Sequence, residues 1–144
     1  MNQDCYGCFW VENAGCRLAF ILRAGYMKSG ISFFTPNEYS QQLAYMQRPA
    51  GYKIPPHVHN VVRREVFNTQ EVLIVKSGRV RVNFFDDNHV KVAEVVVLAG
   101  DIILLAAGGH GFEFLEESEI VEVKQGPYSG DADKTRFEPK EMPR

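Results

Sequence analysis

The residues best suited to metal binding in this 144-residue chain are two histidines one residue apart, in the stretch GYKIPPHVHN at positions 51–60. In an extended segment, residues i and i+2 point to the same side, so His57 and His59 present both imidazoles to one face. Pro55 and Pro56 favour such an extended backbone. Two imidazoles on one face can bind one ion, but surface or packing histidines occur at the same spacing.

A carboxylate that could join the two histidines is Glu71, which begins a predicted core strand. It shares a face with Leu73 and Val75. An ionised carboxylate on such a face is costly unless a cation neutralises it. The alternative is that Glu71 lies at the solvent-exposed start of the strand and pairs with Arg63 or Arg64.

A third imidazole is that of His110, which begins another predicted strand on the face of Phe112 and Phe114. The preceding glycines, Gly108 and Gly109, allow the backbone to approach its neighbours closely. By itself His110 fits a satisfied interior histidine as well as a ligand. A set of three histidines and one carboxylate is formed by His57, His59, Glu71 and His110.

The spacing of these residues resembles the two motifs of the cupin family. Two segments resemble the first motif. In one, Gly51 is followed after five residues by His57-Val58-His59; in the other, Glu71 is followed after six residues by Gly78. The second motif, a Gly usually followed by Asp, then an apolar strand, a turn and a His, is similar to residues 100–110.

The resemblance covers residues 51 to about 114 and implies an all-β jelly-roll barrel, a double-stranded β-helix, with one divalent metal ion inside. It implies that the ion is held by His57, His59, Glu71 and His110. The interval from His59 to Glu71 is longer than in the family, which predicts an inserted loop at residues 60–70. Ala106 stands where the family has a proline.

The ligand set limits the metal without identifying it. Imidazole and carboxylate without thiolate suit Fe(II), Mn(II), Ni(II), Co(II) or Zn(II). Four protein ligands on a six-coordinate ion leave two positions open for a substrate or dioxygen. A tetrahedron closed by four protein ligands would instead be structural.

Short runs rich in Val, Ile, Phe and Tyr, separated by Gly, Pro and Asn-Asp turns, predict strands along most of the chain. The runs are LAFILRA (18–24), GISFF (30–34), QLAYMQR (42–48), EVLIVK (71–76), RVRVNFF (79–85), VAEVVVLA (92–99), DIILLA (101–106), GFEFLE (111–116) and EIVEVKQ (119–125). This pattern favours an all-β barrel or sandwich with no helix longer than about two turns. One domain, 1–144, is predicted, with amino-terminal strands (1–50), a motif-bearing barrel core (51–126) and a polar carboxyl-terminal tail (127–144).

Two strands allow finer predictions. In RVRVNFF, Val80, Val82 and Phe84 share one face and polar residues take the other, which predicts a half-buried strand. EVLIVK is apolar on both faces, so we expect cover on both sides. Ser77-Gly78 predicts a tight hairpin between these two strands.

Residues 37–46 are the best helical alternative, since Asn37 could cap a helix.

Composition excludes some classes of function. Sixteen Lys and Arg are scattered among eighteen Asp and Glu, for a net charge of -2, so no basic stripe for nucleic acid is expected. No long apolar run or signal segment is found, which predicts a cytoplasmic protein without a membrane span. Cys5, Cys8 and Cys16 lack a fourth zinc ligand, so we expect reduced thiols, with redox pairing of Cys5 and Cys8 as the alternative.

Substrate-binding side chains are predicted from strand parity and charge. Gln125 shares a strand face with Val121 and Val123, and the predicted inserted loop carries two arginines that could attract an anion. Packing or solvent-exposed roles are the alternative for each. The candidates are Tyr45, Gln47, Arg63, Arg64 and Gln125.

The leading functional prediction is a metal-dependent enzyme for a small oxygen-bearing molecule, such as an organic acid, a thiol or a sugar derivative. Reactions in the family that the motifs resemble include dioxygenation, decarboxylation and isomerisation, and other members only bind ligands, so fold alone selects none of them. The alternative is a non-catalytic metal- or ligand-binding or sensing protein, with carbohydrates among its candidate ligands. The apolar outer faces of strands 71–76 and 92–99 also predict a homodimer.

Overall fold

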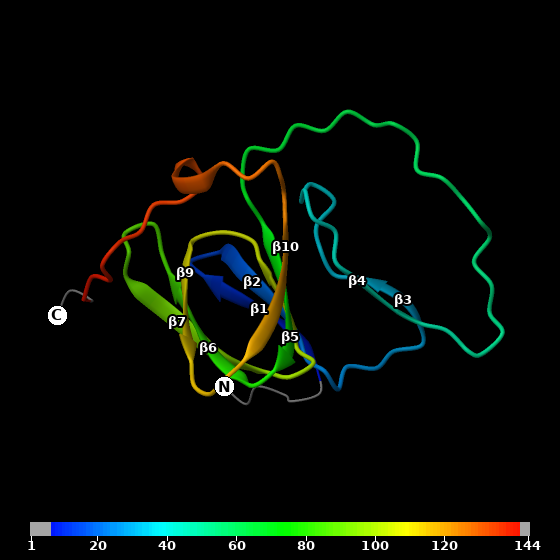
Figure 1. Cartoon of the computed structure of the whole chain (residues 1–144), viewed down its shortest axis with the longest axis horizontal. Helices are drawn as coiled ribbons and strands as arrows, with labels where there is room; N and C mark the ends of the chain where they lie inside the picture. Colours follow the sequence, from blue (N-terminus) through cyan, green and yellow to red (C-terminus); the bar gives the residue numbers. More distant parts are fainter. Residues whose placement is uncertain (1–6, 142–144) are drawn as a thin grey trace. The chain divides into compact units, whose positions relative to one another are not determined.

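The computed structural model describes residues 7–141, which form ten strands and one short 3-10 helix (Figure 1). The strands are β1 (Cys8–Asn13), β2 (Cys16–Leu22), β3 (Gly30–Phe33), β4 (Ala44–Gln47), β5 (Glu71–Ser77), β6 (Arg79–Phe85), β7 (Lys91–Leu98), β8 (Ile102–Leu105), β9 (Gly109–Phe114) and β10 (Glu119–Lys124). The 3-10 helix η1 covers Gly130–Ala132. No helix within residues 7–141 is long and apolar enough to span a bilayer.

The chain divides into two compact units, which we describe separately. The first combines the residues up to Tyr26 with those from Thr69 onward. The second is Met27–Asn68, in which β3 and β4 form an antiparallel pair with Ile31 opposite Met46. In this second unit no strand follows β4, and residues 48–68 are exposed throughout.

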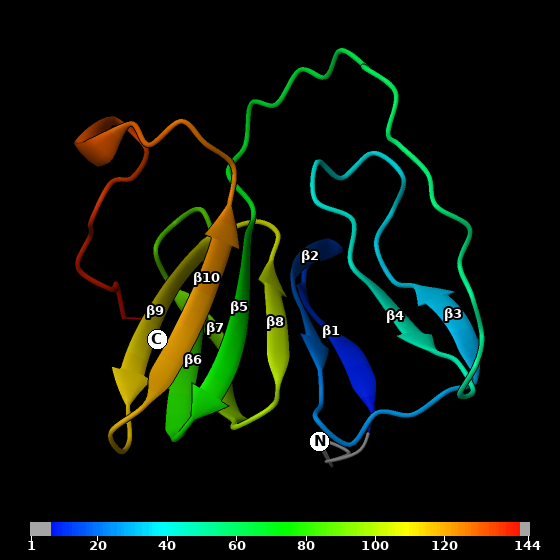
Figure 2. The ribbon, with the colours of Figure 1, turned by 45° about the vertical axis from the view of Figure 1, so that its right-hand side comes forward.

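The first unit is built from two antiparallel sheets that enclose its core. One sheet has the strand order β1-β2-β8-β5-β10 and the other has the order β7-β6-β9. Figure 2 shows β8, β5 and β10 side by side in the first of these sheets. Buried side chains from both sheets form one hydrophobic cluster, including Ile21, Val75, Ile103, Val82 and Val97. Burial of these side chains is the main stabilising contribution to this unit.

The all-β prediction is confirmed, and each of the nine predicted runs contains a strand. The strand at Cys8–Asn13 was not predicted. None of the three sheets closes into a barrel, and residues 37–46 form no helix. Cys8 and Cys16 lie at opposite ends of the β1–β2 pair, since Cys8 is opposite Leu22 and Cys16 is opposite Asn13. Cys5 lies outside the described residues.

The predicted hairpin at Ser77-Gly78 is wrong, because β5 and β6 belong to different sheets. Only Gly78 separates the two strands, which is too short for a two-residue hairpin loop. Its φ is +86°, and a Cβ there would lie 2.5 Å from the Glu117 carbonyl oxygen and overlap the Ser118 side chain. Glycine is therefore needed where the chain passes from one sheet to the other.

The face predictions hold for β6 and hold only in part for β5. Val80, Val82 and Phe84 are fully buried, as their alternation predicts. In β5, Leu73 and Val75 are buried but Ile74 is 37% exposed, so within one chain the strand is covered on one side only. The sequence pattern identified the apolar residues of β5 but could not identify which of them are covered.

A buried ion pair holds the turn that precedes β8. Arg23 Nη1 donates to Asp101 Oδ2 at 2.7 Å and to the Val96 carbonyl oxygen at 2.9 Å. The Asp101 carboxylate also accepts the backbone N–H groups of Ala24 at 2.8 Å and Leu98 at 3.0 Å. This aspartate follows Gly100, and the contacts give it a structural role.

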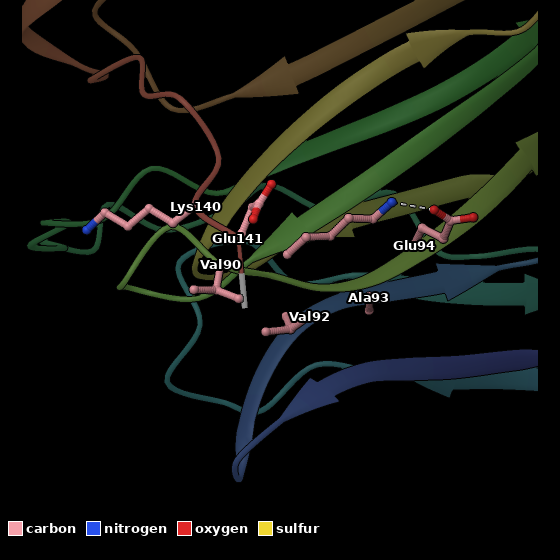
Figure 3. Close-up of a pocket in the computed structure, with 7 residues that line it drawn as sticks. Val90, Val92, Ala93, Glu94, Lys140 and Glu141 are labelled. Atoms are coloured by element: carbon pink, nitrogen blue, oxygen red, sulfur yellow. Dashed lines mark hydrogen bonds and ion pairs between the residues drawn. The ribbon is translucent and has the colours of Figure 1, made fainter. Parts of the chain in front are cut away.

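Within the first unit, the described part of the polar carboxyl-terminal tail packs against His89, between β6 and β7. The Phe137 ring stacks on the His89 ring with centroids 4.0 Å apart, and Lys140 donates its N–H to the His89 carbonyl oxygen at 2.9 Å. An open hollow of about 470 Å³ lies between this tail and β7 (Figure 3). It is lined by Val90, Lys91, Val92, Ala93, Glu94, Lys140 and Glu141, and none of the predicted site residues is among them.

Candidate functional site

The candidate site begins with a contact between two predicted metal ligands, Glu71 and His110. His110 Nε2 lies 3.4 Å from Glu71 Oε2, and both side chains are mostly buried. Glu71 belongs to β5 of one sheet and His110 to β9 of the other. The contact therefore bridges the two sheets of the first unit.

The local backbone explains why these two side chains meet. Glu71 opens β5 directly opposite Leu105 of β8. His110 is opposite the fully buried Phe84 of β6, so its side chain lies on the face of that sheet that carries the core. Gly108 has a φ of +70°, and a Cβ there would lie 2.8 Å from the Phe85 carbonyl oxygen. The close approach predicted for this glycine pair is thus present.

Charged neighbours surround the Glu71 carboxylate. Lys124, its cross-strand partner on β10, places Nζ 3.8 Å from Glu71 Oε1 and 3.0 Å from Glu122 Oε1. The hydrogen bond with His110 is the main cause that lowers the pKa of Glu71, against the effect of burial, and Lys124 adds to the lowering. The hydrogen bond with Glu122 is the main cause that raises the pKa of Lys124. Glu71 is therefore an ionised carboxylate, the form that binds a cation.

The lowered pKa of Glu71 predicts a pH dependence of stability in the metal-free protein. A carboxylate with a depressed folded-state pKa stabilises fully above its ordinary value of 4.5, and this contribution is lost as the pH falls through the lower folded-state value. Urea unfolding with chelator present should show wild type more stable than Glu71→Gln at pH 7, with the difference shrinking below pH 4.5. A difference that stays constant down to pH 3, about one and a half units below the ordinary value of 4.5, would contradict this assignment.

The other two predicted ligands, His57 and His59, lie in the second unit. Their ring centroids are 5.3 Å apart, with an interplanar angle of 74°. His57 Nδ1 lies 3.0 Å from the Pro55 carbonyl oxygen, which leaves Nε2 as the nitrogen for a ligand bond. Each unit thus brings together one pair of the predicted set.

The predicted substrate-binding residues are divided between the two units. Tyr45 is half-buried and Gln47 exposed on β4. Arg63 pairs with Glu65 at 3.7 Å, and Arg64 Nη1 lies 3.4 Å from the Val62 carbonyl oxygen. Both arginines are exposed side chains of the second unit.

Gln125 lies in the first unit, but the parity argument that selected it is wrong. Val121 and Val123 are exposed, whereas Ile120 packs against the core, so the inward face of β10 is that of Ile120. Gln125 follows β10, and its Oε1 accepts the backbone N–H of Gln70 at 2.9 Å. This bond holds the residue that precedes Glu71.

Sequence reasoning missed two residues of the site, Lys124 and Glu122. Both lie on the inward face of β10, at the end that meets Glu71. In EIVEVK the more apolar parity, that of Val121 and Val123, is the exposed one, so alternation indicated the wrong face. The signal that was available is the Glu-Val-Lys spacing itself, which places two opposite charges on one face.

The residues in contact fit part of a metal site. An ionised carboxylate next to an imidazole supplies oxygen and nitrogen donors of the kind that divalent transition metals bind. Within residues 7–141, no group of three or more His, Cys, Asp or Glu side chains is close enough to hold an ion. The structure thus gives two ligand pairs, one in each unit.

Comparisons with known proteins do not extend this description. The chain matches no family model, no curated protein and no solved structure. Function must therefore be inferred from the residues of the site.

Proposed function

We propose that this protein is a metal-dependent enzyme that acts on a small oxygen-bearing molecule. The observation that carries the proposal is the Glu71–His110 contact between the two sheets. Residues 39 positions apart in the sequence meet there, and both were selected as ligands from their places at the starts of predicted strands and from the motif resemblance. The pair supplies one carboxylate oxygen donor and one imidazole nitrogen donor, a combination that divalent transition metals bind.

The proposed ligand set consists of His57, His59, Glu71 and His110 around one divalent ion. The adjacent rings of His57 and His59 support it, since two imidazoles at this spacing can bind the same ion. The resemblance to the cupin motifs supports it independently. The same resemblance favours a jelly-roll barrel as the finer architecture, and two facing antiparallel sheets are consistent with that fold.

The chemistry proposed for the site divides between the ion and the protein. A bound ion of the Fe, Mn, Ni, Co or Zn group would supply Lewis acidity or dioxygen activation. Glu71 and His110 would fix its position, and the mostly buried setting would strengthen their charge interactions. Tyr45, Gln47, Arg63 and Arg64 remain proposed substrate-binding side chains. Gln125 remains one through its place beside the start of β5, not through strand parity.

Turnover is tested with the metal-loaded protein. Anaerobic loading with Fe(II), followed by oxygen uptake with organic acids, thiols and sugars, detects dioxygenation. Nuclear magnetic resonance of the same mixtures with each metal detects decarboxylation or isomerisation. Turnover with any substrate that is lost in Glu71→Gln supports an enzyme. Tight ligand binding without turnover across the panel would favour the non-catalytic binding or sensing alternative.

A homodimer forms part of the proposal. Ile74 is opposite Val121 across the β5–β10 pair, and the exposed fractions of these side chains are 37% and 43%. Val123 of β10 is 48% exposed on the same face. A second copy could cover this apolar surface.

The prediction is a dimeric mass by light scattering at micromolar concentration, shifted toward the monomer by Val121→Lys, because a charge would be buried in the interface. The matched control is Met27→Lys, an exposed residue in the second unit, which should leave the mass unchanged. A monomeric mass for wild type would contradict the proposed dimer.

The proposed cytoplasmic location is tested separately by cell fractionation.

A further inference from the structure

A lysine lies beside the proposed metal ligand Glu71, and its placement suggests a role in metal binding. Lys124 is directly opposite Glu71 in the β5–β10 ladder. Its Nζ lies 3.8 Å from Glu71 Oε1, while His110 faces the other oxygen, Oε2, at 3.4 Å. Both oxygens of the carboxylate thus have a neighbour that a metal ion would have to displace or join.

Lys124 has a second carboxylate within reach. Its Nζ lies 3.0 Å from Glu122 Oε1, closer than to Glu71. Glu122 lies two residues before Lys124 on the same face of β10. The ammonium group is thus shared between one proposed ligand and one residue outside the ligand set. It can leave Glu71 without losing every partner.

Partial burial makes the charge interactions of Glu71 and Lys124 strong enough to affect the affinity for a metal ion. The Glu71 and Lys124 side chains are 15% and 23% exposed, so water screens the pair less than it screens a surface pair. The Tyr128 ring lies 5.8 Å from the ammonium group and adds a favourable contact for the cation. Lys124 is therefore held as a cation close to the carboxylate.

We propose that Lys124 is a built-in competitor for the metal ion at Glu71 and that Glu122 accepts its ammonium group when the ion binds. The inference rests on the proposed metal site. An ammonium group and a divalent cation both gain by approaching the Glu71 carboxylate, and they repel each other. The Lys124–Glu122 pair thus sets how tightly the ion is held.

Two substitutions with opposite expected effects test the inference. One neighbouring charge changes the proton affinity of a carboxylate by about one to three powers of ten. A metal ion is also a cation, so removing the ammonium group in Lys124→Met should tighten metal binding by about tenfold. Glu122→Gln should weaken metal binding by about tenfold, because Lys124 then loses its nearest carboxylate and Glu71 becomes the nearest one. Lys124→Arg keeps the charge and should stay closer to wild type than Lys124→Met.

The matched control is Lys76→Met. Lys76 is another lysine of the same sheet, and its Nζ lies 3.7 Å from Glu119 Oε1 at the far end of β5 from Glu71. Removing this charge changes the net charge of the protein by the same amount. The affinity should remain at the wild-type value, which excludes a general electrostatic effect.

The measurement is the dissociation constant of Zn²⁺, obtained by competition with a fluorescent chelator, with folding of each variant checked by circular dichroism. The inference is supported if Lys124→Met binds Zn²⁺ more tightly than wild type and Lys76→Met does not. This holds even if wild type itself binds Zn²⁺ weakly. Equal affinity in wild type and Lys124→Met, or weaker binding in Lys124→Met, overturns it while leaving the metal site intact. Absence of Zn²⁺ binding in both overturns the proposed metal site and the inference together.

Discussion

Replacing Asp101 with alanine is expected to lower the free energy of unfolding by about 3–5 kcal/mol, the usual cost of removing one partner of a buried ion pair. The Arg23 and Asp101 side chains are 7% and 4% exposed, and Nη1 lies 2.7 Å from Oδ2. Without the carboxylate, the buried guanidinium would keep its hydrogen bond to the Val96 carbonyl oxygen but lose its charged partner. The backbone N–H groups of Ala24 and Leu98 would also lose their acceptor.

Urea unfolding of wild type, Asp101→Ala and a control variant measures this effect. The control is Glu113→Ala, which breaks the 2.6 Å contact between Arg81 Nη1 and Glu113 Oε2 at a more exposed position. A partly exposed pair contributes at most about 1 kcal/mol, because solvent screens it. Similar losses in the two variants would contradict a structural role for the buried Arg23–Asp101 pair.

The second large effect is expected at the proposed ligands. His57→Ala, Glu71→Gln and His110→Ala should each weaken metal binding by at least about 100-fold, since loss even of an outer partner of a metal ligand costs 10–100-fold. Removal of a ligand leaves the ion with fewer donors and, for Glu71, without its charged one. The His57 variant carries the most information, because it tests the link between the two ligand pairs.

The matched control for these substitutions is His89→Ala. His89 stacks on Phe137 and is the one histidine of the chain outside the proposed set. Its metal affinity, measured by titration calorimetry, should equal that of wild type. If His57→Ala binds the metal as tightly as His89→Ala does, the proposed four-ligand set is wrong.

Much of the architecture could be predicted from local patterns. Val80, Val82 and Phe84 alternate with polar residues, so both the strand and its buried face followed from the sequence. The prediction failed in β10, where the more apolar face, that of Val121 and Val123, is the exposed one. Ile120 is inward and Val121 is outward there, and only the pairing with β5 decides between them.

The pairing of strands that lie far apart in the sequence was harder to predict. Ser77-Gly78 contains the residue types of a hairpin, but a single residue links β5 to β6, and each strand finds its partners elsewhere in the chain. The missed strand β1 precedes a turn at Ala14-Gly15 and pairs with β2. Which sheet a strand joins depends on burial of its whole face, which no short window contains.

The site was predicted in part. Glu71 and His110 were selected from their strand positions and the motif resemblance, and they lie in contact, 3.4 Å apart. Lys124 was missed because the search was for ligands, whereas this residue is a cation beside one of them. The spacing of His57 and His59 predicted their proximity to each other, as the 5.3 Å between their rings illustrates.

The proposed four-ligand metal site is tested most directly by anomalous scattering from a crystal of the metal-loaded protein. One peak is expected per chain, at about 2.0–2.2 Å from nitrogens of His57, His59 and His110 and from an oxygen of Glu71. No peak at Glu71 and His110, or a peak there without the two imidazoles of His57 and His59, would contradict it.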